Sequence, residues 1–176
     1  PMNAIVGMTA IATAHIDDRK QVQNCLRKIT LSSKHLLGLI NDVLDMSKIE
    51  SGKLTLTTEQ ISLQEVTEGI VNIMQPQVKA KKQTFDIHVD NILTENVWCD
   101  GVRLNQVLLN LLSNATKYTP EGGAIHLSLF EENSPKGERY VRIYIKVKDN
   151  GIGMSPDFLK RIYESYSRAD GARIHK

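Results

Sequence analysis

The first fifty residues carry apolar side chains at helical spacing. The segment MNAIVGMTAIATAHI repeats them every three to four positions and then meets a short polar break. Asp18 and Gln21 form a start like a capping box for a second helix, which runs to Glu50 and ends at Gly52. We therefore predict a helical hairpin over residues 1–52.

The second of these helices has a heptad pattern. Its apolar positions step by threes and fours at Val22, Leu26, Ile29, Leu36, Ile40 and Val43. Leu37 and Leu44 widen this face, so that a single partner helix would leave part of it uncovered. A four-helix bundle made by two chains would bury the whole face, which predicts a homodimer. The alternative is a hairpin that packs on the second domain of its own chain.

After Gly52 the pattern becomes mixed, which predicts a second domain over residues 53–176. Strand-like alternation occurs in LTLTTEQI, TFDIHVD, AIHLSLF and RYVRIYIKV, with a short strand around Val97-Trp98. Amphipathic helices are predicted for SLQEVTEGIVNIMQPQVKAKK, for residues 101–118 and for a short segment after the N-cap Ser155. The predicted fold class is α+β, with a helical hairpin followed by an α/β sandwich in which helices cover one sheet.

The last predicted strand ends in DNGIGM, residues 149–154. Asp149 continues the apolar parity of this strand, so its carboxylate is aimed into the layer between sheet and helices. A carboxylate there needs a specific donor, and a ligand amine would provide one. Gly151 and Gly153 allow bare backbone to approach something bulky. The alternative is an ordinary turn in which Asp149 is only a cap.

The helix over residues 101–118 carries two stripes of side chains. The first, predicted to pack on the sheet, consists of Leu104, Leu108, Leu111 and Ala115. The second consists of Arg103, Val107, Asn110, Asn114 and Lys117. Asparagine is a poor helix former, so its repeated use in mid-helix argues against an ordinary solvated face. Because amide oxygens ligate hard cations and Lys117 can neutralise a phosphate, we predict a Mg-nucleotide pocket with adenine at Asp149.

Composition narrows the classes of function. Lys and Arg total 22 against 20 Asp and Glu, with no basic block, so charge gives no reason to expect nucleic acid or an anionic membrane. Cys25 and Cys99 lie far apart, which indicates a reducing compartment and free, partly buried thiols. No apolar stretch approaches the roughly 20 residues of a membrane span. We expect a cytoplasmic location, with any membrane anchor of the parent protein outside this sequence.

Several segments resemble sensor histidine kinases. NLLSNATKYT at residues 110–119 resembles their N box, DNGIGM at 149–154 resembles their first glycine box, and DGVRLNQV just upstream also matches. RIYESYSRAD at residues 161–170 resembles the F box, with Tyr163 and Tyr166 where phenylalanine is more usual. PMNAIVGM and LLGLINDVLDMSKIE resemble the dimerisation and histidine-phosphotransfer hairpin, especially of hybrid kinases. The resemblance covers nearly the whole chain and implies an ATP-binding domain of the GHKL type.

The resemblance also assigns roles to single residues. It implies that Asp149 binds the adenine amino group, with Gly151 and Gly153 in the turn below the ring. It implies Asn114 as a Mg²⁺ ligand and Asn110 as a partner of the phosphates or of metal-bound waters. The remaining nucleotide contacts would be Lys117, Tyr118 and Arg168, the last in a lid that begins at Ser167.

The resemblance implies the core of a two-component sensor kinase. Such a core binds Mg-ATP, transfers the γ-phosphoryl group to a histidine and passes it to an aspartate of a response regulator receiver domain. The acceptor histidine is expected before Pro1 and the second glycine box after Lys176, so this segment alone should not phosphorylate itself. Because Asn110 stands where related ATPases carry a water-activating glutamate, slow hydrolysis is expected. The alternative is a noncatalytic dimeric scaffold that senses nucleotide.

Overall fold

The computed structural model describes residues 1–162, and its internal contacts divide the chain into two compact units. The first unit is Pro1–Leu56, and the second begins at Thr57. The four residues that follow Gly52 therefore group with the hairpin rather than with the second unit.

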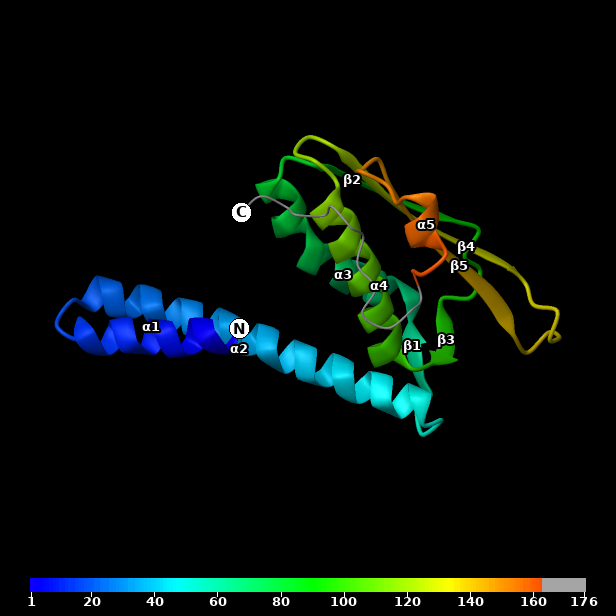
Figure 1. Ribbon diagram of the computed structural model, residues 1–176. Coiled ribbons are helices and arrows are strands. Elements are labelled where there is room, and N and C mark those ends of the chain that lie inside the picture. Colours follow the sequence, from blue (N-terminus) through cyan, green and yellow to red (C-terminus); the bar gives the residue numbers. More distant parts are fainter. Residues whose placement is uncertain (163–176) are drawn as a thin grey trace. The chain divides into compact units, whose positions relative to one another are not determined.

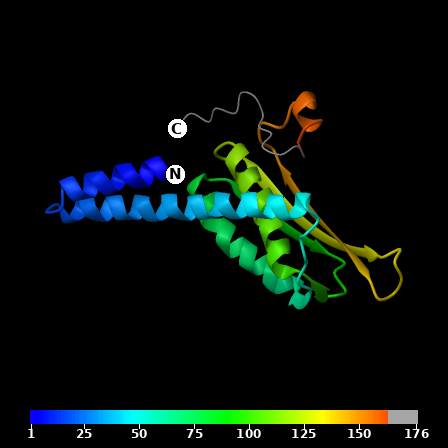
Figure 2. The ribbon, with the colours of Figure 1, turned by 60° about the horizontal axis from the view of Figure 1, so that its bottom comes forward.

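The first unit is a helical hairpin, in which α1 (Met2–Ala14) and α2 (Arg19–Glu50) lie side by side (Figures 1 and 2). Asp18 caps the start of α2, where its Oδ1 accepts hydrogen bonds from the backbone N–H groups of Lys20 and Gln21, both at 3.0 Å. At the other end, Lys53 N–H donates to the Lys48 carbonyl at 2.9 Å, across Gly52 with φ 64°. This is a Schellman closure, for which glycine is favoured because of its positive φ. The predicted start and end of α2 are confirmed.

The hairpin covers only part of the heptad face of α2. The helix α1 has 13 residues and α2 has 32, so the C-terminal part of α2 extends past α1 (Figure 1). Cys25 is 4% exposed, and Val22 and Ile29 are half-buried beside it. Apolar side chains of the same helix remain exposed at Leu26, Leu37, Ile40, Val43 and Leu44. The hairpin therefore leaves a long apolar surface on α2.

The second unit contains three helices and five strands within the described residues. Its helices are α3 (Leu63–Ala80), α4 (Gly101–Tyr118) and α5 (Pro156–Leu159). Its strands are β1 (Glu59–Ser62), β2 (Thr84–Asp90), β3 (Asn96–Cys99), β4 (Ala124–Asn133) and β5 (Val141–Asp149). No helix in the described part of the chain has the length and apolar character needed to cross a membrane.

These strands form two sheets rather than the single predicted one. The larger sheet has the order β2-β4-β5, with β2 parallel and β5 antiparallel to β4, and a separate ribbon pairs β1 with β3. The predicted strand LTLTTEQI forms a strand only from Glu59 onward. Among residues 1–162 the preceding backbone has no strand partner, and the Thr57 N–H donates to the Asp100 carboxylate at 3.0 Å instead.

Helices α3 and α4 cover one face of the larger sheet (Figures 1 and 2). The core between them consists of Ile70, Met74, Leu108, Leu112, Ala115, Ile125, Leu127 and Leu129. One predicted core position is wrong, because Leu111 is 46% exposed and Leu112 is buried. At 3.6 residues per turn, both lie near Leu108 on the helix, and packing against β4 selects the stripe through Leu112 and Ala115.

Candidate functional site

The C-terminal part of the polar stripe of α4, from Asn110 to Lys117, faces solvent. Asn110, Asn114 and Lys117 are exposed at successive turns. Neither asparagine side-chain amide hydrogen-bonds to another described residue, although the Asn110 backbone carbonyl accepts a bond from Ser113. Two mid-helix amides separated by about 6 Å along the axis are thus available to a ligand.

The glycine turn begins where β5 ends. Asp149 pairs with Ile125 of β4, so the two side chains lie on the helix-covered side of the sheet, as strand parity predicts. The expectation that the carboxylate is enclosed there is wrong, because Asp149 is exposed. Its Oδ1 accepts a hydrogen bond from the Gly151 N–H at 2.9 Å. The sheet face is open at this end, which leaves the carboxylate accessible.

The structure joins this turn to the C-terminal end of α4. The Ile152 N–H donates to the Tyr118 carbonyl at 3.2 Å. A Cβ atom at Gly151 would lie 2.6 Å from that carbonyl oxygen, so no other residue fits without a backbone shift. Gly153 has φ 66° and open space around it, which makes it a conformational requirement of the turn. Tyr118, Gly151 and Asp149 are therefore brought together.

Lys117 lies at the same end of α4. Its Nζ lies over the Tyr118 ring, 4.8 Å from the ring centroid. Such a cation–π contact at an exposed site contributes only about 0.5–1 kcal/mol. The ammonium can therefore leave the ring for an anionic ligand at little cost.

Two residues that sequence reasoning missed hold the end of α4 in place. The Gln83 Nε2 donates to the carbonyls of Thr116, Thr119 and Pro120 at 3.1, 2.7 and 3.3 Å. The Lys81 Nζ donates to the carbonyl of Thr116 at 2.7 Å and to those of Lys117 and Thr119 at 3.0 and 3.3 Å. Both come from the connection between α3 and β2, more than thirty positions away in the sequence. They satisfy carbonyls that a helix leaves unpaired at its C-terminus, and the lysine adds a favourable charge.

Asn150, the second residue of the glycine turn, ties the turn to β4. Its Oδ1 accepts a hydrogen bond from the Ala124 N–H at 2.8 Å, and its own N–H donates to the Ala124 carbonyl at 3.2 Å. The amide therefore fixes the turn against the sheet, and this structural role explains why asparagine follows Asp149.

Asp100 sets the other end of α4. Its Oδ1 accepts from the Arg103 N–H at 3.0 Å, and its Oδ2 accepts from the Thr57 N–H at 3.0 Å. The hydrogen bond from Arg103, followed by that from Thr57, lowers the pKa of this carboxyl below its usual value. Asp100 therefore caps α4 and ties it to the segment that leads into β1.

Other predicted features cannot be placed. Arg168 and the two tyrosines of the predicted F box, Tyr163 and Tyr166, lie outside the described residues. Within residues 1–162 no group of three or more His, Cys, Asp or Glu side chains is arranged to hold a metal ion. The sequence predicts a different kind of metal ligand, the side-chain amide oxygens of the asparagines in α4.

Two family models match the chain. The model of the "His Kinase A (phospho-acceptor) domain" matches residues 1–52, and that of the "Histidine kinase-, DNA gyrase B-, and HSP90-like ATPase" matches residues 99–176. The autoinducer 2 sensor kinase/phosphatase LuxQ of Vibrio vulnificus is 34% identical over 170 residues, which cover 97% of this chain and 20% of LuxQ. The chain spans about a fifth of the length of the curated relatives it matches.

Solved structures show the same fold. Full-length ShkA in complex with AMPPNP is 27% identical with a TM-score of 0.65, and the match covers 89% of this chain and 32% of ShkA. The histidine kinase ThkA in complex with the response regulator protein TrrA is 20% identical with a TM-score of 0.63, over 96% of this chain and 47% of ThkA. The hairpin and the α/β unit therefore both have counterparts in histidine kinases.

Proposed function

Since the chain belongs to the sensor histidine kinases, we propose that it forms the central part of a two-component kinase core. In this proposal residues 1–52 are the dimerisation and phosphotransfer hairpin, and residues 53–176 are the ATP-binding domain. The core binds Mg-ATP and transfers its γ-phosphoryl group to a histidine, from which an aspartate of a response regulator receives it.

The observation that carries the nucleotide site is the junction between the glycine turn and α4. Ile152 N–H bonds to the Tyr118 carbonyl at 3.2 Å, and the accessible Asp149 carboxylate lies at the start of the same turn. A purine amino group can donate a hydrogen bond to the Asp149 carboxylate, and glycine backbone without side chains leaves room for the ring. Asp149, Gly151 and Gly153 are therefore the proposed adenine contacts, with Tyr118 beside them.

The exposed amides of α4 fit a magnesium ion. Mg²⁺ prefers oxygen ligands and usually keeps several waters and phosphate oxygens, so it needs few protein donors. Asn114 would ligate it and Asn110 would hold its waters or the phosphates, since neither amide is engaged within the described residues. The bound ion would neutralise phosphate charge during transfer. Lys117 would bind the phosphates after leaving the Tyr118 ring, and Arg168 of the predicted lid would add a further contact.

The residues of this site favour transfer to a histidine over hydrolysis. In the transfer, the bond between the γ-phosphorus and the ADP oxygen breaks, a phosphorus–nitrogen bond forms, and the imidazole N–H proton passes to a carboxylate base beside the histidine. Phosphoryl transfer passes through a loose transition state, so the protein mainly positions the reactants and balances charge. Asn110 cannot accept a proton from water because its side chain is a neutral amide. We therefore expect little ATP hydrolysis.

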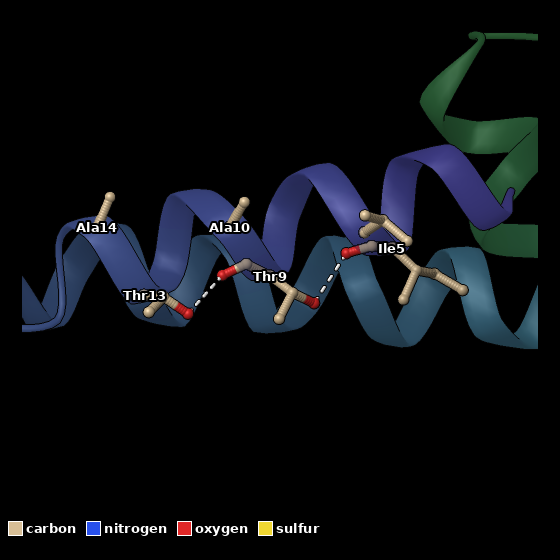
Figure 3. A pocket seen from close by; sticks show the side chains of 6 residues that line it. Ile5, Thr9, Ala10, Thr13 and Ala14 are labelled. Carbon is tan, nitrogen blue, oxygen red and sulfur yellow. Dashed lines mark hydrogen bonds between the residues drawn. The ribbon is translucent and has the colours of Figure 1, made fainter.

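The hairpin is proposed to dimerise through its uncovered apolar surface. Besides the exposed face of α2, α1 has an open, nearly flat surface formed by Ile5, Val6, Thr9, Ala10, Thr13 and Ala14 (Figure 3). Its two threonines turn their hydroxyls back on the helix, from Thr9 to the Ile5 carbonyl at 2.8 Å and from Thr13 to the Thr9 carbonyl at 2.9 Å. Because their hydroxyls are satisfied, this face is suited to packing against another helix.

Calorimetry with ADP and Mg²⁺ on the 176-residue chain tests the site. We expect a heat of association for the parent, and binding weakened about tenfold or more by Asn114→Ala, since a charge-assisted contact contributes about 1.5–3 kcal/mol. Asn72→Ala is the matched control, because Asn72 is an exposed asparagine in the middle of α3. No heat with the folded parent would overturn the proposal.

Phosphorylation separates the kinase from its alternative, a noncatalytic nucleotide-sensing scaffold. The test uses the parent protein with the residues on both sides of this chain and radiolabelled ATP. A kinase incorporates acid-labile phosphate that Asn114→Ala abolishes, and it passes the label to a receiver domain. A scaffold binds ADP in the calorimeter and incorporates no label.

A further inference from the structure

The carbonyls at the C-terminal end of α4 accept hydrogen bonds from two distant parts of the chain. The Lys81 Nζ donates to three of them at 2.7 to 3.3 Å, including those of Lys117 and Thr119. Between these two lies the Tyr118 carbonyl, which accepts the Ile152 N–H of the glycine turn at 3.2 Å. Lys81 and the glycine turn therefore bond to neighbouring carbonyls of the same helix end.

The backbone of Lys81 is itself fixed at both of its polar groups. Its N–H donates to the Gln77 carbonyl of α3 at 3.3 Å, and its carbonyl accepts the Gly122 N–H at 3.2 Å. The residue is half-buried, and its side chain runs from this fixed backbone to the end of α4. An ammonium on a fixed backbone restrains the carbonyls that it bonds, whereas one on a flexible segment would follow their motion.

The next residue, Lys82, makes a different contact. Its Nζ pairs with the Glu121 carboxylate at 2.7 Å, and the two side chains are 79% and 65% exposed. Such an exposed ion pair contributes little to stability. Two adjacent lysines of equal charge thus differ in their partners, and within residues 1–162 only Lys81 donates to α4.

The glycine turn depends on where the end of α4 lies. A Cβ atom at Gly151 would lie 2.6 Å from the Tyr118 carbonyl oxygen, so the turn packs directly against that carbonyl. The last turn of a helix frays unless its unpaired carbonyls find partners. Fraying would displace the Tyr118 carbonyl and break the hydrogen bond from Ile152 that holds the turn.

Lys81 also changes the electrostatics of this helix end. The carbonyls at a helix C-terminus carry a partial negative charge, which disfavours a bound anion. The Lys81 ammonium lies against three of these carbonyls and offsets that charge. Lys117, the proposed phosphate contact, belongs to the same last turn. The geometry and the charge of Lys81 therefore both favour a phosphate bound at this end.

We propose that Lys81 is a positioning residue of the nucleotide site. It does not touch the nucleotide, and it holds the end of α4 so that Lys117, Tyr118 and the glycine turn keep their binding geometry. This inference rests on the proposed function. Lys81 belongs to none of the segments that resemble kinase motifs, so only the hydrogen bonds of the folded chain connect it with the site.

Calorimetry with ADP and Mg²⁺ compares Lys81→Met with Lys82→Met in the 176-residue chain. Methionine keeps an unbranched side chain and removes the charge and the donors. Lys81→Met should bind ADP about tenfold or more weakly than the parent, as for loss of a charge-assisted contact. Lys82→Met, the matched control, should bind ADP as the parent does. Circular dichroism establishes that each variant is folded.

A second pair, Lys81→Gln and Lys82→Gln, keeps the test decisive if Lys81→Met does not fold. Glutamine retains an N–H donor at each position and loses the charge. Lys81→Gln should again bind ADP more weakly than its partner variant.

Amide hydrogen exchange measures the positioning without any nucleotide. The Ile152 N–H should exchange about tenfold faster in Lys81→Met than in Lys82→Met, because the carbonyl that it bonds is no longer held. A residue that contributed only to global stability would leave this local opening unchanged, since global unfolding exposes the amide only in the small unfolded fraction.

The proposal is overturned by equal ADP affinities within either pair of folded variants, or by equal exchange of the Ile152 N–H in Lys81→Met and Lys82→Met. A folded parent that binds no ADP would overturn the proposed function, and with it the nucleotide role of Lys81. The exchange measurement would then decide separately whether Lys81 holds the glycine turn.

Discussion

Asp149 and Ile125 lie directly opposite each other in the β4–β5 ladder, on the same face of the sheet, yet Ile125 is fully buried and Asp149 is exposed. The helices that cover Ile125 leave the neighbouring carboxylate open to solvent. The same face of the sheet is thus buried at Ile125 and exposed to solvent at its cross-strand partner Asp149. This is the place where a ligand can reach a carboxylate that rigid β structure holds in position.

Replacing Asp149 should weaken nucleotide binding and reduce its specificity for adenine. Asp149→Asn keeps the shape and loses the charge that strengthens the bond to an amino donor, so ADP affinity should fall about tenfold or more. The preference for ADP over GDP should also shrink, which calorimetry with both nucleotides would measure.

Asp90→Asn is the control for this substitution. Asp90 ends β2 as Asp149 ends β5, and it pairs with Phe130 on the other face of the sheet. Its replacement should leave ADP affinity unchanged. If the Asp149→Asn and Asp90→Asn variants bind ADP equally, Asp149 does not contact the base.

Two glycines should respond in opposite directions to the same substitution. Gly151→Ala would place a Cβ 2.6 Å from the Tyr118 carbonyl oxygen, and the resulting overpacking should cost about 1–3 kcal/mol. Gly69→Ala lies within α3 with nothing within 4 Å, so it should stabilise the protein by about 0.5–1 kcal/mol. Thermal unfolding measures both. A Gly151→Ala variant as stable as the parent would show that the turn does not need this close approach.

Local patterns predicted the secondary structure well, because capping and periodicity are encoded within a few residues. The predicted spans of β2 and α4 agree with the structure, and the parity of β5 is confirmed. The sequence did not predict that the strands divide into two sheets, or that Leu112 and not Leu111 lies in the core. Both features depend on how distant elements pack. Gln83 was missed for the same reason, as its partners lie 33 to 37 positions away.

The cap that Gln83 provides should be measurable as stability. Its side chain is almost fully buried and donates to three carbonyls, while its Oε1 has no donor among the described residues. Gln83→Leu removes these hydrogen bonds and also the unsatisfied oxygen. The free energy of unfolding should therefore fall by about 2 kcal/mol. Chemical denaturation tests this. Gln64→Leu removes only an exposed bond to Glu68 at 2.8 Å and should change stability by less than about 0.5 kcal/mol.

The apolar face of α2 should determine the oligomeric state. Leu37 and Leu44 are 61% and 52% exposed within the hairpin. Burying each in a dimer contributes about 1.5–3 kcal/mol, and charges at both positions would instead place carboxylates in the interface. The double variant Leu37→Glu/Leu44→Glu should therefore be monomeric in sedimentation analysis.

Leu93 provides the control for oligomerisation. It is 90% exposed in the second unit, so Leu93→Glu adds a similar charge away from the hairpin. This variant should remain a dimer. A dimer that survives the double substitution in α2 would place the interface elsewhere.

Asp100 should make the second unit sensitive to acid. The N–H groups of Arg103 and Thr57 lower the pKa of its carboxyl in the folded state, so the ionised form stabilises the fold. This contribution is complete above the unfolded pKa of about 4 and is lost as pH falls through the lower folded pKa. Asp100→Asn should be less stable than the parent at pH 7 and should lose less stability between pH 5 and pH 3. Asp90→Asn removes a carboxylate that accepts no backbone hydrogen bond in the described part, so its loss on acidification should match that of the parent. Equal acid sensitivity of the parent and the Asp100→Asn variant would contradict the role of this cap, because the two hydrogen bonds that favour the ionised carboxyl would then contribute nothing to folding.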